Sequence, residues 1–433
     1  MGEALLLAGV TLPGGNAADV LVEDGTIIAV GAAGGDPPRP CRRLDLDGYL
    51  LLPAPAEPHA HLDKALTAAR APNLSGDLDG AVRAWLAYRS TMDPGDVVRR
   101  ATTVALRQLG NGATAIRSHV DVGPDIGLRA LEALVQVREA LRGRVELQLV
   151  ALPALPLTGA AGAANRALLR AAIAAGADVV GGCPHLDPDP AACQELCLEL
   201  AGELGRPLDL HSDETLDPTV LYLQELAELV TASGFAHGVT ASHCCSLGMQ
   251  PAKLARRVAE QVAAAGISVV CCPQTNLFLQ ARGHASAQPR GLTALRALRR
   301  AGVPVAAGGD NVQDPFNLVG RGDPLEVASL LVAAGHLDPG EAYDAVSTVA
   351  RAVLGLPEVR VEAGFPAELL AIRAASVPDA VAVASAERVV LHRGRVVCRT
   401  TLARELVEPP APSGPGAGVE PPARAPVASG SPP

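Results

Sequence analysis

Two histidines separated by a single residue, His59 and His61, follow an apolar run at residues 50–56. Side chains in an extended segment alternate between two faces, so both imidazoles point to the same side. A pair placed in this way at the end of a strand can bind one divalent metal ion. Such a triplet also arises by chance, and residues farther along the chain decide between the two interpretations.

Further polar residues stand at the ends of apolar, strand-like segments downstream: His211, Glu214, His243 and Asp310. The predicted metal ligands are three imidazoles and one carboxylate: His59, His61, His211 and Asp310. Nitrogen and oxygen ligands of this kind suit Zn²⁺, Fe²⁺ or Mn²⁺. A metal lowers the pKa of its bound water to about 7 and so supplies hydroxide at neutral pH.

Glu214 lies three residues after His211 and is predicted to carry protons during the reaction. Its alternative is a solvated loop carboxylate. His243 is predicted to orient the hydroxide and polarise the substrate, rather than to serve as a fifth ligand. A single histidine is more simply read as a surface or core residue, but five candidates at predicted strand ends favour a catalytic site.

Substrate contacts are predicted for Lys64 and Asn311. Only two of the 36 basic residues are lysines, so a lysine three residues after a candidate metal ligand stands out. The alternative for Lys64 is an exposed cation paired with Asp63. His119 and His185 also end predicted strands and are predicted to line the pocket, with a purely structural role as the equal alternative.

The elements that must position these residues alternate between strand-like runs and amphipathic helical segments. Eight strand-like runs are predicted, at residues 50–56, 113–119, 145–152, 178–182, 208–211, 238–243, 267–272 and 303–308. Eight such units predict a (β/α)₈ barrel of the TIM type, whose active site is built at the carboxyl ends of the strands.

Short strands with hairpin turns at both ends of the chain predict a small β-sandwich domain built from both termini. We assign residues 1–50 and 359–405 to this domain and residues 51–358 to the barrel. Residues 408–433 are rich in Pro, Gly, Ala and Ser without periodicity and are predicted to be a disordered tail.

Composition excludes several classes of function. A net charge of −10 and only nine Phe, Tyr and Trp residues in 433 argue against a nucleic-acid partner. No apolar run approaches the roughly 18 residues of a membrane span, and the N-terminus lacks a signal-peptide pattern. Nine cysteines, mostly in apolar runs, favour a reducing cytoplasm over a disulfide framework. The sequence leaves open whether the chain forms a homo-oligomer.

The order H-x-H, H-x-x-E, His, Asp resembles that of the amidohydrolase superfamily, and the surrounding sequence is most similar to its cytosine deaminase branch. The resemblance covers about residues 1–405. The motifs that carry it are Glu-Pro-His-Ala-His-Leu-Asp-Lys at 57–64, Ser-His-Val-Asp-Val at 118–122, His-Ser-Asp-Glu at 211–214, Thr-Ala-Ser-His at 240–243, Asn276 through Gln280 with Arg282, and Asp-Asn-Val-Gln-Asp-Pro-Phe at 310–316. It implies a barrel with a small β-sandwich and adds Phe316 to the substrate contacts.

The resemblance also implies a cofactor and a reaction. Members with two metals use a carbamylated lysine on the fourth strand, which is absent from residues 182–185, so one divalent ion, Zn²⁺ or Fe²⁺, is expected. In the reaction that the resemblance implies, water activated by the metal would attack the amine-bearing carbon of an N-heterocycle. Glu214 passes a proton to the ring nitrogen, Asp310 takes the proton of the water, and His243 steadies the attacking oxygen.

Two departures bear on the substrate. Cytosine deaminases carry a glutamine where this chain has Ala154, and a second aspartate where it has Asn311. The Asp-Asn pair and Lys64 are more similar to the N-isopropylammelide amidohydrolases. Three hypotheses follow: a heterocycle deaminase or dealkylaminase, a hydrolase of cyclic or linear amides on the same site, and a metal-binding barrel without turnover. The predicted proton-carrying residues speak against the third.

Overall fold

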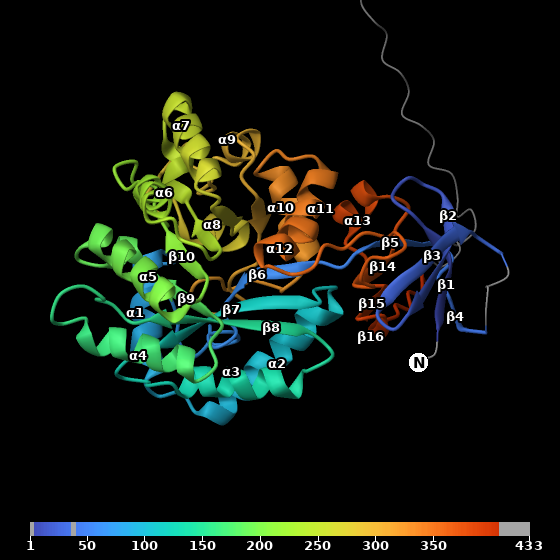
Figure 1. Cartoon of the computed structure of the whole chain (residues 1–433), viewed down its shortest axis with the longest axis horizontal. Coiled ribbons are helices and arrows are strands. Elements are labelled where there is room, and N and C mark those ends of the chain that lie inside the picture. Colours follow the sequence, from blue (N-terminus) through green and yellow to red (C-terminus); the bar gives the residue numbers. More distant parts are fainter. Residues whose placement is uncertain (1–3, 36–39, 407–433) are drawn as a thin grey trace, which may run out of the picture. The chain divides into compact units, whose positions relative to one another are not determined.

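The computed structural model describes residues 4–35 and 40–406. Eight parallel strands follow one another in chain order around a nearly closed barrel (Figure 1). They are β6 (Ala56–Ala60), β7 (Ala115–Val122), β8 (Glu146–Pro153), β9 (Val179–Gly182), β10 (Leu208–Ser212), β11 (Val239–His243), β12 (Ser268–Cys271) and β13 (Val305–Ala307). A parallel bridge between Ala60 and Asp310 joins the two ends of the series. The predicted (β/α)₈ barrel is confirmed.

Helices cover the outside of this barrel, so almost every residue of its strands is buried. The helices of eight residues or more are α1 (Leu78–Arg89), α2 (Pro94–Gly110), α3 (Arg129–Ala140), α4 (Ala163–Ala174), α5 (Pro190–Leu204), α6 (Tyr222–Ser233), α7 (Ala252–Ala264), α10 (Pro324–Ala333) and α11 (Pro339–Val346). The shorter helical segments are η1 (Pro184–Leu186), η2 (Cys245–Met249), α8 (Pro273–Leu279), α9 (Leu295–Arg300), α12 (Thr348–Val353) and α13 (Val377–Val383). Helix α7 shows the common pattern: its apolar side chains Val258 and Val262 are fully buried, while Arg256 and Arg257 are exposed.

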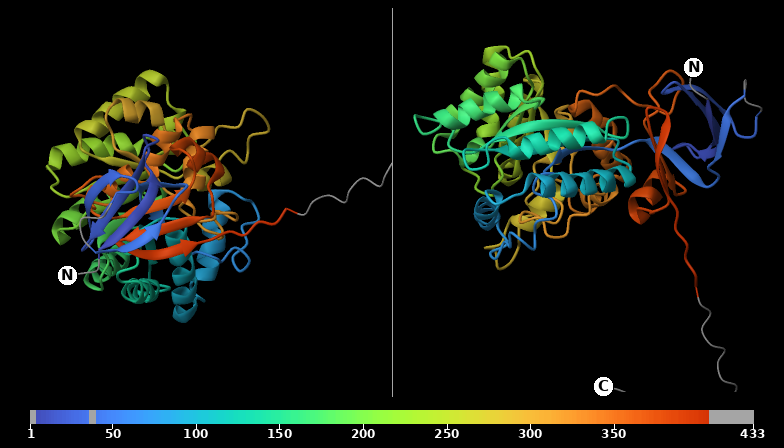
Figure 2. Two further views of the ribbon diagram at one scale, coloured as in Figure 1. Left: turned by 90° about the vertical axis from the view of Figure 1, so that its right-hand side faces the viewer. Right: turned by 90° about the horizontal axis from the view of Figure 1, so that it is seen from below.

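A second, separate sheet is built from strands near the two ends of the chain (Figure 2). Its strands are β1 (Leu5–Thr11), β2 (Ala17–Glu23), β3 (Thr26–Ala32), β4 (Arg42–Asp45), β5 (Tyr49–Pro53), β14 (Leu369–Arg373), β15 (Arg388–His392) and β16 (Arg395–Thr400). The two-residue turns Asp24–Gly25 and Arg393–Gly394 have positive φ at all four residues, as the tight hairpins between twisted strands require. Leu7, Leu51 and Leu369 lie in the core of this sheet.

The apolar run at residues 50–56, predicted as the first barrel strand, is divided between the two sheets. Strand β5 pairs antiparallel with β14 of the terminal sheet, and the barrel begins only with β6. Ala54 and Pro55 lie between the two strands, and Pro55 has no N–H to donate to a ladder. His59 therefore lies within the first barrel strand, and His61 directly after it.

Two further predictions bear on the whole chain. The predicted disordered tail falls on residues 408–433, which lie outside the described residues, and the domain boundaries stay predictions. All nine cysteines are free thiols. Within residues 4–35 and 40–406, no helix combines the length and the apolar character that crossing a membrane requires.

Candidate active site

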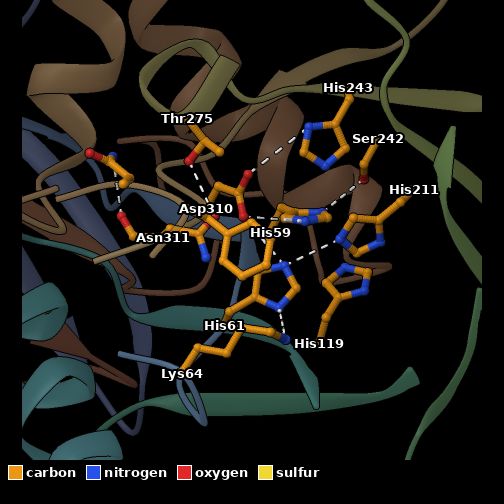
Figure 3. A network of polar contacts seen from close by, with 12 residues as sticks. His59, His61, Lys64, His119, His211, Ser242, His243, Thr275, Asp310 and Asn311 are labelled. Atoms are coloured by element: carbon orange, nitrogen blue, oxygen red, sulfur yellow. Dashed lines mark hydrogen bonds and ion pairs between the residues drawn. The ribbon is translucent and has the colours of Figure 1, made fainter. Parts of the chain in front are cut away.

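Five histidines and one aspartate converge at the carboxyl ends of the barrel strands (Figure 3). They are His59, His61, His119, His211, His243 and Asp310, each at most 6% exposed. The Nε2 atoms of His61 and His211 are 3.2 Å apart. Oδ1 of Asp310 lies 3.4 Å from Nε2 of His61 and 3.7 Å from Nε2 of His59. The structure thus brings the four predicted ligands together from three parts of the barrel.

Backbone contacts that close the barrel place Asp310 among the histidines. The Asp310 N–H donates to the carbonyl of His59 at 2.9 Å, and the His61 N–H donates to the carbonyl of Asp310 at 3.2 Å. Asp310 has φ +63° and His243 has φ +68°, in the left-handed region that side chains other than glycine seldom adopt. Strain of this kind persists where surrounding structure enforces it and is concentrated at functional sites.

The cluster has the properties of a cation site. Several buried polar atoms of the predicted ligands find no hydrogen-bond partner among the described residues: Nε2 of His59, Nδ1 of His211 and both carboxylate oxygens of Asp310. Unpaired buried polar atoms are costly, and a bound cation would satisfy these. Burial lowers the pKa of His59, His61 and His211 well below 6.5. These imidazoles are therefore neutral, which is the form that binds metal.

Two overlapping groups of candidate ligand atoms each lie within 4.8 Å. They are His59, His243, Cys272 and Asp310, and His59, His119 and His211. Three of the predicted ligands, His59, His211 and Asp310, occur in these groups, whereas His61 occurs in neither. Burial raises the pKa of the Cys272 thiol well above its ordinary value, so this side chain stays protonated and behaves as a small apolar group.

A chain of buried polar groups fixes the orientation of His59. Nδ1 of His59 is 2.9 Å from the hydroxyl of Ser242, which donates in turn to Oδ1 of Asp209 at 3.3 Å. Arg117 donates to the other carboxylate oxygen of Asp209 at 2.8 Å. Because Ser242 uses its proton toward Asp209, it accepts the Nδ1 proton of His59. The Nε2 lone pair of His59 is then free for a metal.

Glu57 fastens the first barrel strand to the segment before Asp310. Its carboxylate accepts from the N–H of His59 at 3.1 Å and from the N–H of Gly309 at 2.9 Å. A Cβ on Gly308 would come within 2.4 Å of this carboxylate, so only glycine fits there. Glu57 thereby positions both His59 and Asp310 without reaching the reacting atoms.

Glu214 and His243 share one neighbour, Asn276 on α8. The Asn276 amide donates to Oε1 of Glu214 and to Nδ1 of His243, both at 3.2 Å. His243 therefore carries its proton on Nε2 and presents it as a donor, as expected of a residue that orients an oxygen. Burial raises the pKa of Glu214 to about 8, so this carboxyl holds a proton at neutral pH.

Lys64 is buried, with 4% of its surface exposed, and is not the surface cation of the alternative interpretation. Its Nζ donates to Asp121 at 2.6 Å and lies 3.1 Å from Nδ1 of His61, whereas Asp63 is 3.9 Å away. Asp121 also accepts from the indole of Trp85 and from Arg89, which ties helix α1 to the site. Burial opposes the charge of Lys64, but the two aspartates outweigh it and raise the pKa of the ammonium.

A cavity of ≈ 220 Å³ opens over the cluster. Its polar floor includes Glu214, His243 and Asp310, with Lys64 and Asn311 beside them. The opposite wall is mainly apolar and includes Leu78, Val82, Leu86, Leu152, Ala154 and Phe316. Its volume lies below the range of about 300–1,000 Å³ typical of drug-sized ligands, so the cavity suits a small ring.

His119 and His185, which were predicted to line the pocket or to be purely structural, lie outside this cavity. His119 stacks on His59, with ring centroids 4.0 Å apart, and does not line the cavity. Nδ1 of His185 donates to the backbone carbonyl of His211 at 3.3 Å, and His185 lines an adjoining outer cavity of ≈ 590 Å³. The two cavities share Glu214 in their walls.

A sequence profile described as "Amidohydrolase family" matches residues 42–398. The chain belongs to the amidohydrolase family. The predicted superfamily and the predicted class, a hydrolase of carbon–nitrogen bonds, are thereby confirmed. Metal dependence is expected of this family, and the His/Asp cluster of the amidohydrolase is a group that can hold an ion.

Three relatives of this amidohydrolase have related activities. A pterin deaminase of Rhizobium rhizogenes is 35% identical over 389 residues, 88% of each chain. The structure of 5-methylcytosine deaminase from Klebsiella pneumoniae, with 5-fluorocytosine bound, is 29% identical with a TM-score of 0.83, covering 94% of this chain and 99% of the other. N-isopropylammelide isopropylaminohydrolase from Burkholderia multivorans is 30% identical with a TM-score of 0.79, covering 92% and 99%.

The structure adds positioning residues that the sequence analysis did not select. Ser242, Asp209, Asn276 and Glu57 contact the predicted site residues from behind. Glu57, Ser242 and Asn276 all lie in motifs that carry the family resemblance, so a signal existed for these three. For Asp209 the sequence offers only its place in an apolar strand, two residues before His211.

Proposed function

We propose that this amidohydrolase removes an amino group hydrolytically from a small N-heterocycle. One observation supports the proposal most directly. The same cavity is lined by the neutral histidines His61 and His211 and by the buried carboxyl of Glu214, which holds a proton. The deaminase activities named for two of the relatives above support the same reaction. A barrel used only for metal binding would not need Glu214 to be kept protonated.

The residues that would hold the metal are His59, His61, His211 and Asp310. When bound, a divalent ion such as Zn²⁺ or Fe²⁺ supplies Lewis acidity that activates water for attack at neutral pH. Glu214 would donate its proton to the ring nitrogen next to the amine-bearing carbon. Asp310, whose pKa is raised by burial, would accept the proton of the attacking water. His243 would hold the attacking oxygen through its Nε2 proton.

The cavity lining supports a ring with a carbonyl or anionic oxygen beside the reacting carbon. The ammonium of Lys64 and the side chain of Asn311 are among the polar groups that line the cavity, together with Arg89 and Asp121. Cytosine deaminases carry a glutamine at the position of Ala154, and the alanine side chain cannot form that hydrogen bond with the ring. Losing a hydrogen bond of this kind can reduce the preference for one substrate over another by about 10⁴. Cytosine is therefore disfavoured as the substrate. A ring amine carried by a pterin, and an alkylamine carried by an ammelide, remain as the two substrate classes.

The test is a panel assay of ammonia and amine release with metal-reconstituted enzyme. The substrates are pterin, cytosine, isocytosine, 5-methylcytosine, ammelide and N-isopropylammelide. Ammonia from at least one ring supports deamination, and isopropylamine alone would favour the dealkylaminase. Release of neither, with hydrolysis of a cyclic amide such as dihydrouracil, would replace the proposal by an amide hydrolase.

We expect one tightly bound metal ion per chain. Lys64 and Lys253 are the only lysines, and neither lies on the fourth barrel strand, where a bridging lysine would be needed for a second ion. Lys64 is moreover held by Asp121. Metal analysis of fully active enzyme checks this, and two retained ions per chain would contradict it.

We expect Lys64→Arg to lower kcat/KM on the best substrate about tenfold or more, which is about 1.4 kcal/mol of transition-state binding. The planar guanidinium is bulkier than an ammonium and cannot replace it as a compact point charge between Asp121 and His61. Lys253→Arg, on an exposed face of α7, is the matched control. Steady-state kinetics with metal content measured in parallel decide the point; unchanged kinetics would remove Lys64 from the substrate contacts.

A further inference from the structure

A second large cavity lies on the outside of the barrel, between helices α7 and α9, which pack side by side (Figure 1). Its volume is ≈ 830 Å³. Its walls come from η2, α7, residues 289–294, α9 and the turn at 334–336. It shares no lining residue with the cavity over the histidine cluster.

The lining of this α7–α9 cavity is strongly basic in an acidic protein. Its charged and titratable residues are Arg256, Arg290, Arg296, Arg300, His336 and one acid, Glu260. Residues 251–300 contain eight Lys and Arg residues against a single Asp or Glu, although the whole chain carries a net charge of −10. The concentration of like charge at one cavity favours an anionic ligand over a chance distribution.

Three of the arginines are available to such a ligand. Arg256, Arg296 and Arg300 make no side-chain hydrogen bond or ion pair with another described residue. Their neighbour Arg299 is different, since it pairs with Glu341 at 2.8 Å and does not line the cavity. Glu260 is the only acid in the lining, so the guanidinium groups outnumber the carboxylates there, and a bound anion would offset the excess positive charge.

The fourth arginine and a buried hydroxyl complete the walls. Arg290 donates to the carbonyl of Ala334 at 2.7 Å and to Nε2 of His336 at 2.8 Å, which fixes one wall to the turn after α10. Thr293 also lines the cavity. It is 5% exposed, and its hydroxyl has no hydrogen-bond partner among the described residues.

We propose that the α7–α9 cavity binds a small organic molecule that carries two or more phosphate groups, of the size of a nucleoside diphosphate. A guanidinium group can donate two parallel hydrogen bonds to the oxygens of one phosphate. Because several arginines line the cavity, we expect the ligand to carry more than one phosphate. The volume lies in the range of sites for organic ligands, and Leu247, Met249, Leu292 and Leu295 supply apolar wall for a ring. The Thr293 hydroxyl would gain its missing partner.

The experiment is calorimetric titration of the metal-loaded enzyme at low ionic strength with ADP, pyrophosphate and adenosine as probes. We expect saturable binding of ADP and pyrophosphate at one site per chain, and none of adenosine. In the double variant Arg256→Gln/Arg300→Gln, ADP binding should weaken by at least about tenfold, since hydrogen bonds to charged groups are lost. Arg257→Gln, adjacent on α7 but outside the cavity, is the matched control and should bind normally.

The variants also separate this cavity from the metal site, to which phosphates can bind directly. Turnover of the best heterocycle should be unchanged in the double variant, because none of its residues lies in the active-site cavity. Unaltered ADP binding by the double variant would place the ligand elsewhere and overturn the proposal. An equal loss in Arg257→Gln, or no binding of ADP and pyrophosphate at ~1 mM, would overturn it as well.

Discussion

Glu214→Gln is expected to keep the fold and the bound metal but to lower kcat by at least about 10²-fold, or about 2.7 kcal/mol of transition-state stabilisation. Glutamine has nearly the same shape and can still accept the hydrogen bond from Asn276. It cannot pass a proton to a ring nitrogen. Burial holds the pKa of Glu214 at about 8, so the wild-type carboxyl has a proton to give at neutral pH.

The measurement is steady-state kinetics on the best ring of the panel, with metal content and melting temperature determined on the same sample. Glu225→Gln on α6 is the matched control, because it makes the same substitution at a glutamate that lies outside the cavity. A Glu214→Gln enzyme that retains most of its kcat would remove this residue from proton transfer. A variant without metal would show instead that Glu214 supports the ligand set.

Ser242→Ala is expected to weaken metal binding about 10–100-fold, the usual effect of losing a hydrogen-bond partner behind a metal-binding histidine. The substitution leaves Nδ1 of His59 without its acceptor at 2.9 Å. It also removes the hydrogen bond that Ser242 donates to Asp209, while the hydrogen bond from Arg117 to Asp209 remains. His59 is then no longer held with Nε2 directed at the ion.

Competition with a chelator reports this change independently of turnover. The matched control is Ser246→Ala, because Ser246 is fully buried on the same rim, and its hydroxyl has no partner among residues 4–35 and 40–406. We expect that variant to bind metal like the wild type. Equal affinities in Ser242→Ala and wild type would show that packing alone orients His59.

Local patterns were enough to predict the ligand set as a hypothesis. His59 and His61 are two residues apart, and His211, His243 and Asp310 follow apolar strands whose ends meet at one rim of a barrel. The barrel itself follows from the alternation of strand and helix patterns. The first strand was misplaced because residues 50–56 are uniformly apolar, and such a run does not indicate which of two sheets it joins.

The sequence did not indicate which polar side chains are buried or which residues they contact. Lys64 follows the predicted metal ligands His59 and His61 in the sequence. This position is compatible with a surface cation and with a buried one. Asp121 from β7 and the side chains of α1 decide the matter by enclosing it. His119 and His185 both end strand-like runs, yet one stacks beneath the ligand histidines and the other lines the outer cavity.

The sequence by itself determined the family, the barrel and the types of residue at the site, because those depend on the order of motifs and on the periodicity of apolar residues along the chain. The tertiary structure alone decided which buried polar atoms have no hydrogen-bond partner and which ring nitrogen of His59 and of His243 carries the proton. It also decided that arginines of α7 and α9 line a common cavity. Those properties arise from contacts between residues far apart in the chain. No local pattern encodes such contacts, since each depends on the distance and burial of a partner from another element.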